Sequence, residues 1–244
     1  MDALTATDMK NNFLVLYDKV TNFAAAGYED SEISFFLTKA QDQIVKRYYN
    51  YKGNKYQEGF EETEKRRKDL AELIRHSDID CDIAVLGPQT GASANGIFVD
   101  LPEKYLYTLR EEVTIKDAVD SCYADGTLLE VKPVTHDEYT ANVRNPFKKP
   151  DITKVWRLDF SSDNNGARRH ELITDGSYTI DTYKLRYLKQ PTDIEIDINP
   201  LNDKNCELNS SMHQEIVDTA VRIAAGITDP VTYQIKVNEE NQTE

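Results

Sequence analysis

Three carboxylates alternate with other residues over Asp78-Ile79-Asp80-Cys81-Asp82, and this spacing is how a calcium loop of the EF-hand type begins. Such a loop also needs a glycine at its sharp turn and a later glutamate that binds calcium through both oxygens. Both are missing at the required positions. The sequence therefore disfavours a calcium site here.

Two histidines are followed by carboxylates and could begin metal sites. His213 precedes Glu215 and Asp218, and His136 is followed directly by two acidic residues. Neither stretch has a second histidine at i+4, the spacing at which one helix binds zinc. Polar residues in the exposed first turn of a helix, where acidic side chains are favoured, explain both stretches better. The four histidines also give no catalytic triad.

The run Lys65-Arg66-Arg67-Lys68 could contact phosphate, but it follows three glutamates, and a solvated helix face is the favoured interpretation. The signatures of serine hydrolases, zinc proteases, P-loop proteins and dinucleotide-binding domains are also missing from the sequence. We therefore predict no catalytic, cofactor-binding or metal-binding residue and no enzyme activity.

The composition is that of an ordered globular protein with excess negative charge. Of 244 residues, 39% are hydrophobic and 30% charged, and the formal net charge is −14. Wrapping DNA by phosphate neutralisation needs a basic face, so this charge argues against it. An acidic surface can still surround DNA and repel it, which would let DNA move past without binding.

The chain is expected to work without a membrane and without disulfides. No apolar run approaches the roughly 20 residues that span a bilayer, and the start lacks the features of a signal peptide. Cys81, Cys122 and Cys206 are odd in number and widely spaced, which suits thiols in a reducing cytoplasm.

The first 76 residues are expected to be helical. A capping-box pattern at Thr5–Asp8 begins a helix that ends at Gly27, and a second helix follows from Asp30. Their apolar faces favour an antiparallel pair. A third helix, over Phe60–His76, is dominated by charge and has only a thin apolar stripe.

From Ile79 to about Ile198 the apolar period changes to two, which predicts a β-rich region. Residue pairs that end in glycine separate the strands and favour hairpins with antiparallel pairing. One short helix begins at the Thr135 capping box and ends after Arg144. The candidate strands are Ile83–Leu86, Tyr105–Ile115, Leu128–Val134, Val155–Phe160, His170–Thr174 and Tyr183–Gln190. The turn pairs are Asn95-Gly96, Asp125-Gly126, Asn165-Gly166 and Asp175-Gly176.

A last helix begins near Ser211 and is ended by Gly226 and Pro230, leaving a polar arm. The sequence thus predicts an α+β fold in which the N-terminal and C-terminal helices form a helical bundle with a central antiparallel β-rich insertion. The expected parts are a helical part over 1–78, the β-rich insertion with one short helix over 79–198, and a C-terminal helix with its polar arm over 199–244.

Two further features indicate contact surfaces. Trp156, the single tryptophan, lies in the strand-like VWRLDF segment and is expected in the core or in an interface. The run from Asn145 to Pro150 is an extended loop, stiffened by proline, with an exposed aromatic side chain. A contact with a neighbouring subunit and a plain connecting loop are both open for this run.

Four stretches resemble ring proteins of crAss-like bacteriophages: Asn54–Leu70, Val131–Pro150, Tyr187–Asp197 and, most clearly, Cys206–Glu240. In the last, HQEIVDTAV followed by a D-P-x-x-Y turn is similar to the final helix and tail of phage neck and tail adaptor subunits. The resemblance covers nearly the whole chain and carries over no individual functional residue.

The resemblance implies a structural virion protein of a short-tailed phage, a ring of the head-to-tail connector or tail barrel, located in the neck or tail and assembled in the host cytoplasm. It implies a cyclic homo-oligomer, with twelve copies expected, below the portal protein and stacked with other ring and tail proteins. DNA would be ejected through the lumen without specific binding.

Two other classes of function remain open from the residues alone. One is an assembly chaperone that does not enter the virion, or another small acidic binding module, which would be monomeric or dimeric. The other is an enzyme of unknown type, which would show a cleft that gathers His136, His170 or His213 with carboxylates. We expect no such cleft.

Overall fold

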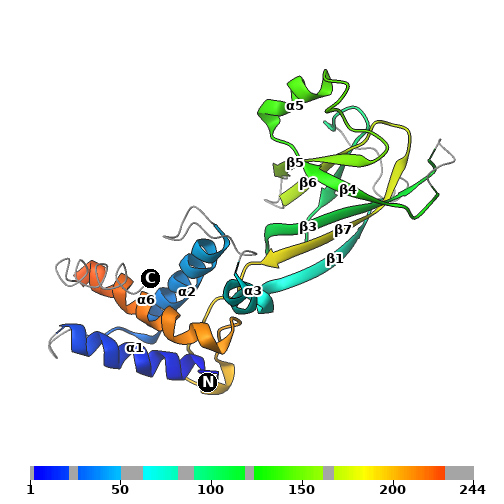
Figure 1. The fold of residues 1–244 in the computed structure, drawn as a ribbon. Helices are drawn as coiled ribbons and strands as arrows, with labels where there is room; N and C mark the ends of the chain where they lie inside the picture. The colour runs from blue at the N-terminus through cyan, green and yellow to red at the C-terminus, as the bar shows by residue number, and fades with distance from the viewer. Residues whose placement is uncertain are drawn as a thin grey trace. The chain divides into compact units, whose positions relative to one another are not determined.

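The computed structural model describes residues 3–21, 27–50, 63–81, 91–118, 124–161 and 168–228 (Figure 1). The chain divides into two compact units. One combines Met1–Leu73 with Gln190–Glu244 and is helical, and the other is the β-rich stretch Ile74–Lys189. The described residues hold five α-helices and seven strands, so the fold is α+β.

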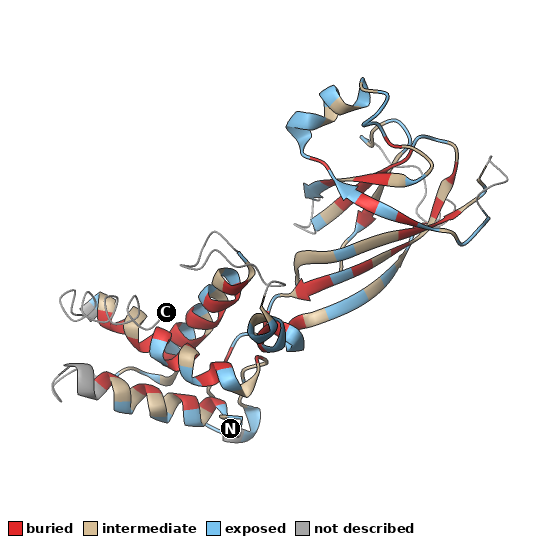
Figure 2. Ribbon diagram, in the orientation of Figure 1, coloured by how far each residue is buried: buried red, intermediate tan, exposed pale blue. Residues whose placement is uncertain are grey.

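Three longer helices make up most of the helical unit: α1 (Ala6–Thr21), α2 (Asp30–Tyr49) and α6 (Ser210–Thr228). α6 packs against both of the others. Phe13 of α1 stacks on Phe36 of α2 with 6.2 Å between ring centroids, and Tyr28, just before α2, packs edge-on against both rings. Figure 2 shows buried positions recurring along α2 and α6, as the apolar spacing of both helices requires. The largest fully buried side chains of this unit are Met9, Phe13, Ile33, Leu37, Ile44, Leu70 and Leu73.

The capping box predicted at the start of α1 is confirmed. The Asp8 carboxylate accepts hydrogen bonds from the Thr5 N–H at 3.0 Å and from its hydroxyl at 2.7 Å, and the Thr5 hydroxyl accepts one from the Asp8 N–H at 3.1 Å. These bonds satisfy backbone donors that the first helical turn leaves without partners. They also lower the pKa of Asp8.

The segment that follows the β-rich unit, residues 192–196, is hydrogen-bonded to one face of α2. The side chains of Ser34, Thr38 and Gln41 lie three or four residues apart and therefore share a face of the helix. Ser34 Oγ accepts from the Ile196 N–H at 3.0 Å, and Thr38 Oγ1 accepts from the Ile194 N–H at 3.0 Å. Gln41 Nε2 donates to the Thr192 carbonyl at 2.9 Å.

The β-rich unit is one seven-stranded mixed sheet that curls into a half-barrel. The spatial order is β1-β7-β3-β4-β5-β6-β2, and every neighbouring pair is antiparallel except β4 and β5, which are parallel. The strands are β1 (Ile74–Asp80), β2 (Gly96–Asp100), β3 (Tyr105–Lys116), β4 (Leu128–Pro133), β5 (Lys154–Ser161), β6 (Arg168–Ile173) and β7 (Thr179–Lys189).

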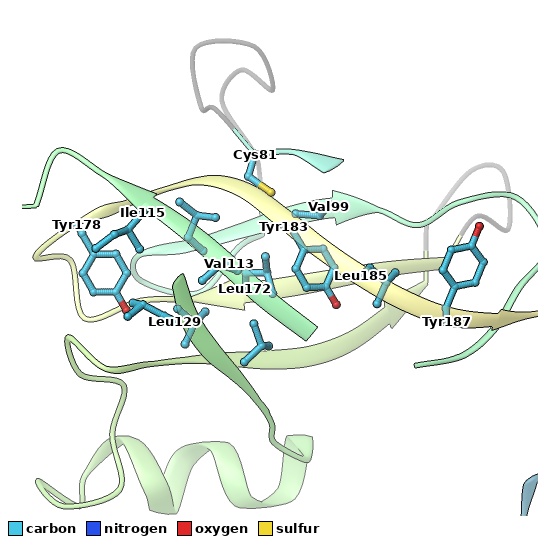
Figure 3. Close-up of a cluster of buried hydrophobic side chains, with 13 residues drawn as sticks. Cys81, Val99, Val113, Ile115, Leu129, Leu172, Tyr178, Tyr183, Leu185 and Tyr187 are labelled. Carbon is cyan, nitrogen blue, oxygen red and sulfur yellow. The ribbon is translucent and has the colours of Figure 1, made fainter. Parts of the chain in front are cut away.

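The concave face of this sheet holds a core to which all the inner strands contribute (Figure 3). Along β7 the side chains of Tyr183, Leu185 and Tyr187 alternate into it, as the two-residue period of a strand dictates. They pack with Val113 of β3 and Leu172 of β6. Side chains that line one curled face can thus fill the interior without a second sheet.

A smaller core lies on the other face of β5 and β6. Trp156, Leu158 and Ile173 are buried there, and the ring of Tyr139 packs edge-on against Trp156 with 6.1 Å between centroids. Tyr139 comes from α5 (His136–Val143), which buries none of its residues fully. Trp156 is therefore a core residue, as one of the two sequence interpretations expected.

The predicted architecture, a helical bundle with an antiparallel insertion, is wrong in two respects. The described helices are too few for a bundle, because α3 covers only Glu64–Leu70, a 3₁₀ turn follows over Ala71–Leu73, and β1 begins at Ile74 inside the predicted third helix. The sheet is mixed because the chain between β4 and β5 is long enough for a crossover, with α5 inside it.

The hairpin predictions hold at one described turn and fail at another. Asp125-Gly126 lies between β3 and β4, which pair antiparallel, and Gly126 has φ of +86°. Asp175-Gly176 lies between β6 and β7, which are not neighbours in the sheet. The sequence also missed β1 and β2. The predicted strand at Ile83–Leu86 and the turn at Asn165-Gly166 lie outside the described residues.

Candidate functional site

A group of connected charged and polar side chains joins several strands of the half-barrel. Arg157 of β5 and Glu111 of β3 form an ion pair in which Nη1 and Oε1 are 2.5 Å apart. The two side chains are only 11% and 7% exposed. Arg157 Nη1 also donates to Thr108 Oγ1 at 3.0 Å. Because β3 and β5 are separated by β4, this pair ties strands that do not pair with each other.

Tyr183 of β7 and His170 of β6 extend the cluster. The Tyr183 hydroxyl donates to Glu111 Oε2 at 2.8 Å and lies 2.9 Å from His170 Nδ1. His170 Nε2 is 3.2 Å from Asp159 Oδ1. A chain of polar contacts therefore runs from the buried Glu111 to the exposed Asp159, through a tyrosine and a histidine.

Burial shifts the pKa values of the two titratable side chains that contact the Tyr183 hydroxyl. Burial raises the pKa of Glu111, against the opposing effect of Arg157, and burial lowers the pKa of His170. Burial thus opposes the charged forms of both groups, whereas the ion pair with Arg157 and the hydrogen bond from Tyr183 favour the charged form of Glu111.

The cluster lies among packed side chains, and its contacts do not indicate a reaction with a bound substrate. Tyr183 is fully buried and is part of the interior core, and burial strongly raises its pKa. The arrangement can link strands β3, β5, β6 and β7 across the interior. We interpret it as a structural element of the half-barrel.

Two of the three histidines singled out by the sequence, His136 and His170, both contact Asp159, whereas His213 belongs to the other unit. His213 is 2% exposed, so its expected place in an exposed helical turn is wrong. Its Nδ1 accepts from the Leu4 N–H at 3.1 Å, and its Nε2 lies 3.0 Å from the Leu208 carbonyl. His136 is exposed, as expected, and its Nε2 is 2.9 Å from the Asp159 carbonyl.

The carboxylates near His213 are engaged with other side chains. Glu215 accepts from Arg47 at 2.6 Å and from the Tyr48 hydroxyl at 2.8 Å. Asp218 accepts from the Gln214 amide at 3.1 Å. Among the residues that the structure describes, no group of three or more histidine, cysteine or acidic side chains is placed to hold a metal ion.

The calcium-like stretch is a strand and not a loop. Asp78 and Asp80 lie on β1, where His76 Nε2 contacts Asp78 Oδ1 at 3.2 Å, while Asp82 lies outside the described residues. Two aspartates on one face of an extended strand are about 6.6 Å apart along the chain, which is not how a loop folds around an ion.

The basic run lies on α3, and part of it contacts the end of α2. The charged groups of Lys65 and Arg66 lie 5.9 and 5.5 Å from the centre of the Tyr48 ring, within range of a cation–π interaction. Arg67 and Lys68 are exposed. This agrees with the solvated helix face that the sequence favoured for most of the run.

Three large apolar side chains are almost fully exposed to solvent. Ile198 is 99% exposed, Leu201 91% and Phe147 89%. The sequence indicated Phe147, through its proline-stiffened loop, but missed Ile198 and Leu201. Two apolar residues inside a run rich in Asp and Asn could have indicated them, because such runs form exposed turns. Large exposed apolar groups of this kind mark contact surfaces when they gather.

Comparison with known proteins decides the class. Residues 4–236 match a family described as phage tail ring protein 3/4, and this match includes residues of both units. The chain belongs to this family. It is similar to "Ring protein 4/5" of Bacteroides phage crAss001, with 33% identity over 234 residues, 91% of this chain and 92% of that protein. It is also similar to "Ring protein 3" of the same phage, with 31% identity over 204 residues, 80% of this chain and 84% of that protein.

Membership of the ring protein family confirms the resemblance to ring proteins of crAss-like phages. The protein is a structural virion component of the phage tail and not an enzyme. The helices that the structure describes include none with the length and apolar character needed to cross a membrane.

Proposed function

We propose that this protein forms a ring in the head-to-tail connector or tail barrel of a short-tailed phage, and that the genome leaves the capsid through the lumen of that ring. The observation that carries the proposal is the family match, which spans both the helical and the β-rich unit. Relatives named as ring proteins that align over most of their length support the same role for the whole chain.

The ring is a cyclic assembly of identical copies, for which we propose twelve subunits, stacked against the portal protein and other ring proteins. A closed ring of identical subunits needs two different and complementary surfaces on each copy. The exposed apolar side chains of the two units supply candidates for such surfaces.

The charge of the chain fits passage of DNA without binding. With a net charge of −14, a lumen lined by this protein would repel phosphate and release few counterions. A basic lumen in a ring structure would contradict this part of the proposal.

The test is electron microscopy with mass measurement of the purified full-length chain, alone and mixed with portal and neighbouring ring proteins. Rings whose mass corresponds to twelve copies are the expected result. A chain that stays monomeric with all these partners and is missing from purified virions would overturn the proposal. That result would favour a chaperone that leaves before the virion is complete.

A further inference from the structure

The 195–204 loop, from Glu195 to Lys204, is a closed and braced projection of the helical unit. Its two ends pair through backbone hydrogen bonds of 2.9 and 3.2 Å, and Lys204 Nζ lies 2.7 Å from Glu195 Oε2. Inside it, Asp203 Oδ1 accepts from the Asp197 N–H at 2.9 Å. Asp203 Oδ2 accepts from Thr7 Oγ1 of α1 at 2.7 Å. The loop therefore holds its shape before it meets a partner.

This braced loop presents two aliphatic side chains to solvent. Ile198 and Leu201 are the two most exposed of the large apolar side chains that the structure describes. Burial of both side chains against a partner removes apolar surface from water, and a loop that already holds its shape loses little conformational entropy on docking. Three carboxylates and one lysine give the loop a charge of −2.

The 143–149 turn, from Val143 to Lys149, has the opposite charge and a similar apolar tip. Phe147 is 89% exposed and Val143 is exposed as well. The Phe147 N–H donates to Asn145 Oδ1 at 3.0 Å, and the Asn145 carbonyl accepts from the N–H groups of Lys148 and Lys149. One arginine and two lysines give this turn a charge of +3. It belongs to the β-rich unit.

We propose that the 195–204 loop of one copy docks on the 143–149 turn of the next copy in the ring, an inference that rests on the proposed function. Opposite charges with apolar centres make the two surfaces complementary, and their difference makes the contact head-to-tail, which is what a closed ring requires. The apolar side chains form the centre of the contact and the charged groups form its rim.

The other described run of basic side chains fits the loop less well. On α3 no large apolar side chain is exposed, and the charged groups of Lys65 and Arg66 lie over Tyr48 within the same chain. A contact of the loop with α3 would therefore leave Ile198 and Leu201 without apolar partners. The 143–149 turn combines both features.

Substitution gives the first test. Ile198→Ser with Leu201→Ser, and separately Phe147→Ser, should raise the concentration at which rings form by about tenfold or more for each apolar side chain removed. Val15→Ser is the matched control, because Val15 is 54% exposed on α1, outside both segments. Equal effects at Val15 and at the loop would overturn the inference. Unfolding curves on the monomer verify that each variant is folded.

Photocrosslinking separates the inference from the proposed function. A benzophenone amino acid replaces Phe147 in unlabelled chains, these are assembled with ¹⁵N-labelled chains, and crosslinked peptides are sequenced by mass spectrometry. We expect mixed-isotope links to residues 195–204. Rings in which links go elsewhere, or only within one chain, would overturn this inference and leave the proposed function intact. A chain that never assembles, even with its tail partners, would overturn the proposed function and this inference with it.

Discussion

The hydroxyl of Tyr183 lies 2.9 Å from Nδ1 of His170, although the strands that carry them are separated in the sheet by three others. In a flat sheet, strands about 4.8 Å apart would hold β7 and β6 roughly 19 Å from each other. The contact is therefore direct evidence that the sheet curls strongly enough to bring side chains of β6 and β7 together on its concave face. The polar cluster and the apolar core together fill the enclosed space.

Removal of Arg157 should destabilise the half-barrel strongly. Arg157→Met keeps much of the side-chain volume but leaves Glu111 buried without its ion partner. A broken buried pair costs about 3–5 kcal/mol in the free energy of unfolding. Urea unfolding followed by tryptophan fluorescence measures this, because Trp156 is buried on β5.

Arg110→Met is the matched control for that experiment. Arg110 pairs with Glu112 on the same strand, and its side chain is 61% exposed. Exposed pairs of this kind contribute about 1 kcal/mol or less. If the two variants lost similar amounts of stability, the interior pair would not be the link between strands that we describe.

Replacement of Glu111 by glutamine should change how stability depends on pH. Burial raises the pKa of Glu111 in the folded protein above its usual 4.5, so the folded state binds its proton more tightly than the unfolded state does. The stability that this carboxyl contributes is full below pH 4.5 and is lost as the pH rises through the folded value.

Glu111→Gln stays neutral, and its amide oxygen can still accept from the Tyr183 hydroxyl, so its stability relative to the natural protein should increase as the pH rises above 4.5. Unfolding free energies at a series of pH values measure this difference. Parallel curves for the two proteins would show that Glu111 is ionised alike in the folded and unfolded chain.

Local signals in the sequence predicted elements well and their arrangement poorly. The two-residue period located β3 and β5 to within a residue or two, and the Thr135 capping box located α5. Such local signals could not predict the order of the strands in the sheet. The glycine turn at Asp175-Gly176 indicates only that the chain reverses direction. It does not determine whether the next strand pairs with its predecessor or crosses the interior.

The missed strand β1 has a different cause. Its sequence, Ile74 to Asp80, is polar at most positions, and the charged stretch before it has helical spacing. Pairing with β7 along its whole length makes it a strand, which is a tertiary interaction that no local pattern reports. The interior polar cluster was missed for the same reason, since its members lie far apart in the sequence.

The turn at Gly126 should not tolerate a side chain. Its φ of +86° is a backbone conformation that residues with a Cβ avoid, although nothing lies within 4 Å of an added Cβ. Gly126→Ala should cost about 1–2 kcal/mol of stability through backbone strain alone. Gly27→Ala, also in open space but without a positive φ, should be neutral or slightly stabilising. Thermal unfolding of both variants checks the prediction, and equal melting temperatures would contradict it.

Two of the three cysteines should be unreactive in the folded protein. Burial raises the pKa of Cys81 to about 12 and that of Cys206 to about 11, so few thiolates exist at pH 8. In a Cys122→Ser variant, Ellman's reagent should modify both remaining thiols much more slowly in the native state than in urea. Rapid reaction of either thiol without denaturant would show that its surroundings open readily.

His213 should fasten the N-terminal segment to α6. Its ring accepts a hydrogen bond from the Leu4 N–H and donates one to the Leu208 carbonyl, which fixes the neutral tautomer with the proton on Nε2. His213→Phe fills the buried volume but satisfies neither group, so we expect a loss of about 1–3 kcal/mol.

His76→Phe is the control for the His213 variant, because His76 is exposed on β1 and should cost about 0.5 kcal/mol or less. Hydrogen exchange adds a local readout. In His213→Phe the amide of Leu4 should exchange faster, whereas the strands of the half-barrel, which belong to the other unit, should keep their protection. Faster exchange throughout both units would mean that the histidine supports the global fold and not this one attachment.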